Sequence, residues 1–332
     1  MNSKLTGAVA ALALLAGATA ASAQIEIKIA TLAPEGTPWY DALATWETNV
    51  ESASNGEIDM QIFTGGQLGN EYDVYKQIQR GRIDIGAFSQ TVIADHVAEV
   101  SLMMTPFLFD DVATIDCIYD GALGDELATL VEAEGFKHLS WGETGWVHIY
   151  AKDDLSNVDD VEGYKARVDP QPTSRLMWNA VGANQTEIPY AESPAALQTG
   201  LIKAGESATI SYVAFGLGKV APHFMKTYHL HQAGATVMGE KTWNKLSAEH
   251  QQIIMDGLPP QDEVRASIRG LGDLMLGGYI DAGGPVHELT PEQRAAWKAK
   301  VEPSWPDLVS DLGGRSEELW PKLLAAKASC EG

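Results

Sequence analysis

The feature that most constrains this fold is a strand–helix–strand order that occurs twice along the chain. Alternating apolar and polar residues predict the strands, and apolar residues three or four apart predict the helices between them. The predicted strands cover residues 25–29, 58–63, 83–88, 165–169 and 186–190. This order is typical of parallel strands joined by crossover helices, so the sequence predicts two similar α/β lobes.

Ligands of open α/β sheets bind beyond the carboxyl ends of the strands. Two facing lobes bring those ends together, so we expect one cleft between them. The loops selected in this way are 31–39, 64–71, 88–91, 167–173, 190–193 and 206–212. No low-complexity linker separates the lobes, which indicates that the chain crosses between them more than once. We expect lobe I to comprise residues 24–146 and about 231–265, and lobe II residues 147–230 and about 266–332 with the C-terminal helices.

The N-terminus has the three parts of a secretory signal peptide. Lys4 is the basic part, residues 8–16 are apolar, and Ala21-Ser22-Ala23 forms a cleavage site before Gln24. The alternative is a membrane anchor, but the apolar part is shorter than the ~20 residues that a spanning helix needs. We therefore expect residues 1–23 to be removed and the mature chain to be soluble outside the cytoplasm.

The charge of the chain excludes two classes of partner. Its 332 residues include 23 Lys and Arg against 45 Asp and Glu, for a formal net charge of −22. Such a surface repels nucleic acid and anionic lipid, so we expect no nucleic-acid partner. The net charge says little about a small ligand, because one local cation dominates a binding site.

The chain has two cysteines, Cys117 and Cys330. In an oxidising compartment they would pair and tie the C-terminal tail to the first lobe. The alternative is two unpaired thiols, and the sequence leaves both open. Their separation fits no cysteine-based metal site.

No motif predicts catalysis or a cofactor. Residues 205–209 (GESAT) approach the G-x-S-x-G turn of serine hydrolases, but the last glycine is replaced by Thr209. His229 and His231 share one face of a predicted strand, yet no third metal ligand is nearby. The sequence also lacks a phosphate-binding loop and a dinucleotide fingerprint. We therefore expect a protein that is not an enzyme and that holds neither a cofactor nor a metal.

Arg167 is the leading candidate for ligand binding. It lies in a strand-like segment that ends at Pro170, where few charges are expected. A guanidinium holds a carboxylate through two parallel hydrogen bonds. The alternative is a structural pair with Asp169, and the residues alone do not decide between the two.

The other candidate residues also have ordinary structural explanations. Trp39, Trp146 and Tyr212 could cover a ligand, but aromatic residues also pack in cores, and Trp39 fits an apolar helix stripe. Glu71 begins a helix, where an acid favours the helix dipole. The candidate ligand-binding residues are Trp39, Glu71, Ser89, Gln90, Trp146, Arg167, Asp169, Ser207 and Tyr212.

Several motifs occur together in the order of a known family. They are ATLAPEGTPW at 30–39, GGQLGNE at 65–71, QIQRGRIDIG at 77–86, PFLF at 106–109, GYKARV at 163–168 and AALQTG at 195–200. With these motifs the chain resembles the substrate-binding proteins of tripartite ATP-independent periplasmic (TRAP) transporters, of the dicarboxylate-receptor type. The resemblance covers nearly the whole mature chain.

The resemblance implies a fold and a set of partners. The fold is α/β, of the type II periplasmic binding protein kind, with two α/β lobes, a ligand cleft between them and a long helix that crosses both. The partners are a small organic acid and the permease subunits of a sodium-driven TRAP transporter. We expect a monomer in the periplasm.

Arg167 stands where the family's carboxylate-binding arginine is found. Two positions depart from the family: Ser207 replaces a ligand-holding Asn, and Trp146-Val147 stand where a second arginine is common. The departures favour a monocarboxylate, an aromatic or hydroxy acid, or a sulfonate over a dicarboxylate or sialic acid. Alternatives to a transport receptor are a sensor for a signalling protein and, less favoured, a periplasmic hydrolase.

Overall fold

The computed structural model describes residues 24–331, so the predicted signal peptide lies outside the described residues. Nine strands of this part form one sheet in the order β2-β1-β3-β8-β4-β7-β5-β6, with β9 beside β8. The strands are β1 (Ile25–Thr31), β2 (Ile58–Phe63), β3 (Ile85–Ser89), β4 (Phe136–Ala151), β5 (Lys165–Val168), β6 (Asn184–Glu187), β7 (Ala204–Ala208), β8 (His223–Gly239) and β9 (Val286–Glu288).

The sheet consists of two parallel ends joined by two long antiparallel strands. At one end β1 pairs in parallel with β2 and β3, and at the other β5 pairs in parallel with β6 and β7. Between them β4 and β8 pair with each other, with three register shifts along their length. Because β8 also pairs with β3 and β4 with β7, the two long strands belong to both halves.

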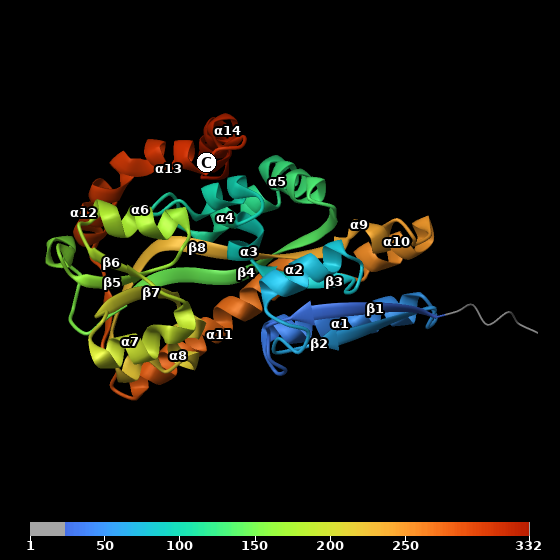
Figure 1. Cartoon of the computed structure of the whole chain (residues 1–332), viewed down its shortest axis with the longest axis horizontal. Helices are drawn as coiled ribbons and strands as arrows, with labels where there is room; N and C mark the ends of the chain where they lie inside the picture. Colours follow the sequence, from blue (N-terminus) through green and yellow to red (C-terminus); the bar gives the residue numbers. More distant parts are fainter. Residues whose placement is uncertain (1–23, 332) are drawn as a thin grey trace, which may run out of the picture.

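Helices cover the sheet on both sides (Figure 1). Those of the first half are α1 (Pro38–Ala53), α2 (Glu71–Gln79), α3 (Gln90–Ala94), α4 (Val112–Tyr119) and α5 (Ala122–Ala133). Next come α6 (Pro172–Ala180), α7 (Ser193–Thr199), α8 (Thr209–Ala214), α9 (Glu240–Trp243) and α10 (Ala248–Asp256). The last are α11 (Gln261–Asp281), α12 (Pro291–Val301), α13 (Trp305–Leu312) and α14 (Ser316–Cys330).

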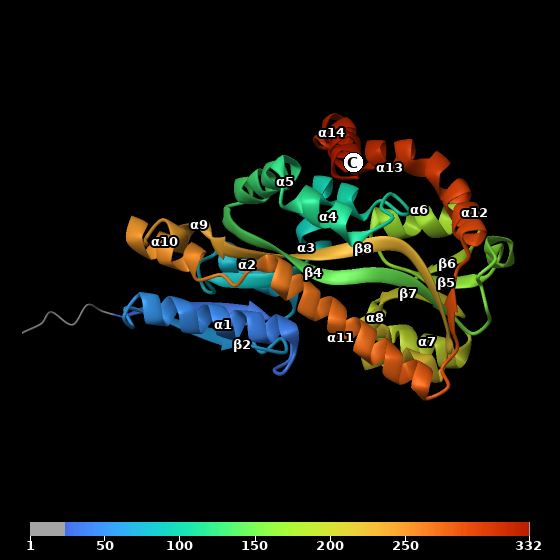
Figure 2. The same ribbon diagram turned by 180° about the vertical axis from the view of Figure 1, so that it is seen from behind.

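The long helix α11 crosses the molecule, as the resemblance implied. Figure 2 shows it running obliquely in front of the sheet, and it contacts α1, β4 and α8. Its interior glycines do not interrupt it, because packing against the sheet offsets their low helix propensity. The α/β class, the two lobes and the crossing helix are therefore confirmed. Among the helices of residues 24–331, none combines the length and apolar character needed to cross a bilayer.

Local signals placed most element ends. Thr290 and Gln293 form the reciprocal hydrogen bonds of a capping box at α12. Ser247 caps α10 by accepting from the backbone N–H of His250. Gly200 ends α7 with a φ of 76°, a conformation that glycine adopts without steric cost.

One predicted strand is displaced. The strand predicted at 186–190 covers Asn184–Glu187, because Pro189 cannot donate to a sheet and Tyr190 begins a short 3₁₀ helix. Trp146 lies inside β4, which continues through Gly145. Gly145 instead has a φ of 109° and lies beside a register shift, so the glycine marks a bulge in a continuous strand.

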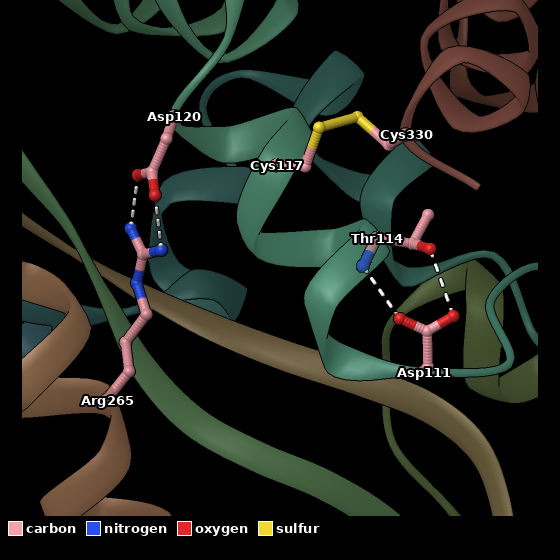
Figure 3. Close-up of a disulfide and its surroundings, with 6 residues drawn as sticks. All are labelled: Asp111, Thr114, Cys117, Asp120, Arg265 and Cys330. Atoms are coloured by element: carbon pink, nitrogen blue, oxygen red, sulfur yellow. Dashed lines mark hydrogen bonds and ion pairs between the residues drawn. A yellow bond between two sulfur atoms is a disulfide. The ribbon is translucent and has the colours of Figure 1, made fainter. Parts of the chain in front are cut away.

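The two cysteines, which the sequence left either paired or free, are joined in this structure. Cys117 on α4 and Cys330 at the end of α14 form a disulfide across 213 residues (Figure 3). The bond ties the C-terminal helix to the first half of the chain, and α14 also packs against α5.

Candidate functional site

A cavity of about 160 Å³ lies where the two halves of the sheet meet. Arg167 and Asp169 reach it from the end of β5, and Glu206 and Ser207 from β7. The long strands contribute Thr144, Val147, Leu230 and Gln232, and the first half contributes Thr91 and Met104. The lining is mostly polar at the β5 and β7 side and apolar at Met104, Val147 and Leu230.

Arg167 is the most buried charged group that lines the cavity, with only 2% of its surface exposed. Its Nε donates to the carbonyl oxygen of Ile188 at 3.1 Å, and Nη2 donates to Asp169 Oδ2 at 2.8 Å. The guanidinium lies over the ring of Tyr190, 5.2 Å from its centroid. Within the described chain Nη1 has no hydrogen-bond partner, so the fork keeps donors for a bound group.

Asp169 is held at the mouth of the cavity. Its backbone N–H donates to Ser174 Oγ at 3.0 Å, which fixes the turn from β5 into α6. Its side chain is 31% exposed, so water reaches the carboxylate that Arg167 pairs with. The pair is therefore open on one side, unlike a core ion pair.

Glu206 is a second, deeper carboxylate of the lining. It accepts from His229 Nε2 at 3.1 Å, while His229 Nδ1 is 2.7 Å from Thr227 Oγ1. Burial alone would raise the pKa of Glu206, but the hydrogen bond and charge of His229, with a hydrogen bond from Ser174, lower it. Glu206 is therefore a carboxylate in the folded protein at neutral pH.

Two hydroxyl groups complete the β7 side. Ser207 Oγ donates to the carbonyl oxygen of Ala208 at 2.9 Å, and Tyr190 Oη lies 2.5 Å from Ser207 Oγ. Because the serine proton is used, Tyr190 is the donor of this second bond. Burial raises the pKa of Tyr190, so it remains a neutral phenol whose oxygen can accept from a ligand.

Three of the nine candidate residues line the cavity: Arg167, Asp169 and Ser207. Glu71 and Ser89 lie elsewhere and bond to each other, since the Glu71 carboxylate accepts from the Ser89 backbone N–H at 2.6 Å and from its hydroxyl at 2.9 Å. Glu71 borders a separate cavity of about 10 Å³. These two residues hold α2 against the end of β3.

The remaining four candidates pack around the cavity without lining it. Trp39 donates from Nε1 to the carbonyl oxygen of Glu143 at 2.7 Å, and Trp146 packs edge-on against Tyr228 and His231. Gln90 is buried and accepts from the Ala233 backbone N–H at 2.7 Å. Tyr212 is fully buried and donates to the carbonyl oxygen of Ala221 at 3.0 Å.

Sequence reasoning did not single out several lining residues. Tyr190 and Glu206 fall in loops that the strand-end rule selected, so the rule found their segments but not their roles. Thr144 and Gln232 lie on β4 and β8, whose antiparallel pairing no local pattern indicates. The rule had no means to find them.

The chain matches one family model over residues 29–311, that of the bacterial extracellular solute-binding proteins, family 7, or DctP. A solute-binding protein of Chromohalobacter salexigens is 25% identical over 280 residues, which are 84% of this chain and 83% of that protein. The C4-dicarboxylate-binding periplasmic protein DctP of Rhodobacter capsulatus is 24% identical over 315 residues, 94% of each chain.

Solved structures have the same fold. A TRAP periplasmic solute-binding protein of Pseudomonas putida F1 with bound D-glucuronate is 28% identical, with a TM-score of 0.75 over 88% of this chain and 97% of that one. A sugar acid binding protein of Advenella mimigardefordensis, in complex with galactonate, is 23% identical, with a TM-score of 0.83 over 92% and 99%.

Proposed function

Because the chain belongs to the bacterial extracellular solute-binding proteins of family 7, the DctP family, we propose that it is the solute receptor of a TRAP transporter. It binds a small organic acid and delivers it to sodium-driven permease subunits in the membrane. The observation that carries the proposal is Arg167, a guanidinium with 2% exposure that faces a cavity and keeps unpaired donors.

An arginine in this position is suited to an acid ligand. Removing a guanidinium from water is costly unless its donors find acceptors. Asp169 and Ile188 satisfy part of the fork, and a ligand carboxylate would satisfy Nη1. A hydrogen bond to a charged group contributes about 1.5–3 kcal/mol, which is enough for one residue to favour an anionic group.

We propose a receptor without catalytic activity. Ser207 Oγ bonds with Ala208 and Tyr190, whereas His229 bonds with Thr227 and Glu206. In the described chain the serine hydroxyl therefore has no histidine base, which a hydrolase of the Ser–His type requires. The relatives named for a function are binding proteins.

We propose that the two lobes meet within β4 and β8, at residues 146–147 and 230–231. Trp146 pairs with His231 and Val147 with Leu230, so the two proposed boundaries lie side by side on neighbouring strands. Bending of both strands at this level would open and close the cavity between Thr91 and Met104 on one side and Arg167 on the other.

We propose that the mature protein works in the periplasm after cleavage before Gln24. Two relatives are named periplasmic proteins, and the basic and apolar parts of residues 1–23 are typical of a signal peptide. N-terminal sequencing of the exported protein checks this, because the first residue found should be Gln24.

A thermal-shift screen of the mature chain against small carboxylates and sulfonates tests the receptor function. The protein is first unfolded and refolded, which removes any ligand carried through purification. A ligand at 100 times its dissociation constant stabilises the fold by ~2.7 kcal/mol, a readily measured rise in Tm. A rise with a compound that carries a carboxylate or sulfonate supports the proposal; rises only with compounds that carry neither group contradict it.

A further inference from the structure

The charges around the cavity do not favour a simple anion. Among the described residues that line it, Arg167 is the only Lys or Arg, whereas Asp169 and Glu206 are both acids. His229 lies behind Glu206 and adds a positive charge only when it is protonated. The formal charge of this group is therefore −1 with a neutral His229 and zero with a protonated one.

A bound carboxylate would meet Asp169 as well as Arg167. Asp169 Oδ2 is 2.8 Å from Arg167 Nη2, so a carboxylate on the same guanidinium lies close to a like charge. Arg167 itself is buried, and repulsion between like charges is stronger beside a buried group than in water. An anion with one negative charge and nothing else would leave the cavity with an excess negative charge.

The mouth of the cavity is acidic as well. Gln171, which lines the cavity, donates from Nε2 to Asp95 Oδ1 at 2.5 Å, and this bond links α6 to the C-terminal end of α3. Burial raises the pKa of the neighbouring Tyr72, as do a hydrogen bond to Asp95 and the charges of Asp95, Asp169 and Glu71. A third carboxylate, that of Asp95, therefore lies beside the lining residue Gln171.

We propose that the ligand is a zwitterion, an organic acid that also carries a protonated amine, with its carboxylate on Arg167 and its amine between Asp169 and Glu206. This inference rests on the proposed function and narrows its ligand class. The carboxylate satisfies Arg167 Nη1, which has no acceptor among the described residues. The amine offsets the two acids, so the filled cavity gains no net charge.

Asp169 and Glu206 both line the cavity and have acceptor positions left for an amine. Asp169 uses one oxygen for Arg167, and its side chain is partly open to the cavity and to water. Glu206 uses Oε2 for His229, and a carboxylate has about four acceptor positions. A ligand hydroxyl can fill the same positions, but it leaves the charges uncompensated.

Calorimetric titration of the refolded mature chain with matched pairs of acids tests the inference. Each pair has one carbon skeleton and differs in one group: L-lactate against L-alanine, 2-hydroxyisovalerate against L-valine, 3-phenyllactate against L-phenylalanine, and 4-hydroxybutyrate against 4-aminobutyrate. We expect the tightest-binding compound to be an amino acid, at least tenfold tighter than its hydroxy partner.

Asp169→Asn extends the test. The amide keeps the shape of the side chain and removes its charge, so we expect the amino-to-hydroxy affinity ratio to fall at least tenfold. Glu318→Gln is the matched control. Glu318 lies on α14, outside the cavity lining, and its exposed carboxylate pairs with Arg315. Its removal should leave the affinity ratio unchanged.

The outcomes separate the two proposals. If the hydroxy acids bind as tightly as their amino partners or tighter, the zwitterion is overturned while the acid receptor stands. If neither member of any pair binds, both proposals are contradicted for ligands of this size. A variant that fails to fold removes only the second arm, because the wild-type ratio decides the ligand class by itself.

Discussion

Two regions of this molecule hold buried arginines against aspartates, and they do so differently. Arg265 on α11 donates to both oxygens of Asp120 at 2.9 and 2.6 Å, and Arg269 to both oxygens of Asp116 at 2.8 and 2.7 Å. Arg167 gives Asp169 a single bond of 2.8 Å. In the first region each guanidinium holds one carboxylate through two bonds, whereas in the second Arg167 Nη1 has no hydrogen-bond partner among the described residues and faces a cavity.

The two arginine regions also lie in different parts of the fold. Helix α4 carries Asp116 and Cys117, and Asp120 is its C-cap. This one short helix is therefore tied to α11 by ion pairs and to α14 by a disulfide (Figure 3). The Arg167 region lies beside β4 and β8, where the two halves join. An arginine that holds one carboxylate through two bonds stabilises a fixed contact, and one with a free Nη donor is available to a ligand.

Loss of the disulfide should have the largest effect on the fixed region. The double change Cys117→Ser with Cys330→Ser opens a link across 213 residues and should lower the free energy of unfolding by about 4 kcal/mol. Urea unfolding of the variant measures this. Ligand affinity should stay within about twofold of wild type, because the binding site is untouched. A tenfold loss, which corresponds to about 1.4 kcal/mol, would show that the two regions are coupled.

Glu143→Ala should have the next largest effect, because it weakens the contact between β4 and α11. The buried Glu143 carboxylate accepts from His231 at 2.8 Å and from Arg269 at 2.6 Å, so its removal leaves both without that partner. Breaking a buried pair costs about 3 kcal/mol. Urea unfolding checks the value, with Glu318→Gln on the exposed face of α14 as the control. A loss as small as that of the control would mean that the network is not structural.

Arg167→Ala should weaken ligand binding rather than stability. We expect ligand affinity to fall at least tenfold, which is about 1.4 kcal/mol, while Tm changes little, because water can solvate the partly exposed Asp169. Arg167→Lys retains the charge without the fork and should remain weak. Calorimetry and melting curves on the same samples measure both quantities. Unchanged affinity in Arg167→Ala would exclude Arg167 as the anion contact.

The smallest expected effect is on acid stability. Burial would raise the pKa of Glu143, but His231 and Arg269 lower it below 4.5, its ordinary value. As pH falls, Glu143 therefore takes up a proton at a higher pH in the unfolded state than in the folded state. The stabilisation by its carboxylate is complete above about pH 5 and is lost as pH falls toward the pKa of the folded state. Glu143→Gln should therefore show a shallower fall in unfolding free energy between about pH 5 and pH 3. An unchanged slope would assign the acid sensitivity to other carboxylates, such as Glu206, whose pKa is also lowered.

The sequence by itself determined the parts that depend on near neighbours. Alternation predicted β1 and β2, and the strand-end rule selected the segments of Arg167, Tyr190 and Glu206. The side chains of Ser247 and Thr290 cap the helices that follow them. These signals act over a few residues, because a cap bonds two or three positions away and a strand alternates every second residue.

Only the tertiary structure decided what distant residues do together. The register of β4 against β8 brings Thr144 and Gln232 to the cavity, and no local pattern specifies that register. The same two strands bring Glu143 and His231 within hydrogen-bond distance, 88 residues apart in the chain. The charge balance around a ligand depends on side chains from many segments of the chain. It can be evaluated only in the folded structure, where these side chains lie within a few ångströms of one another.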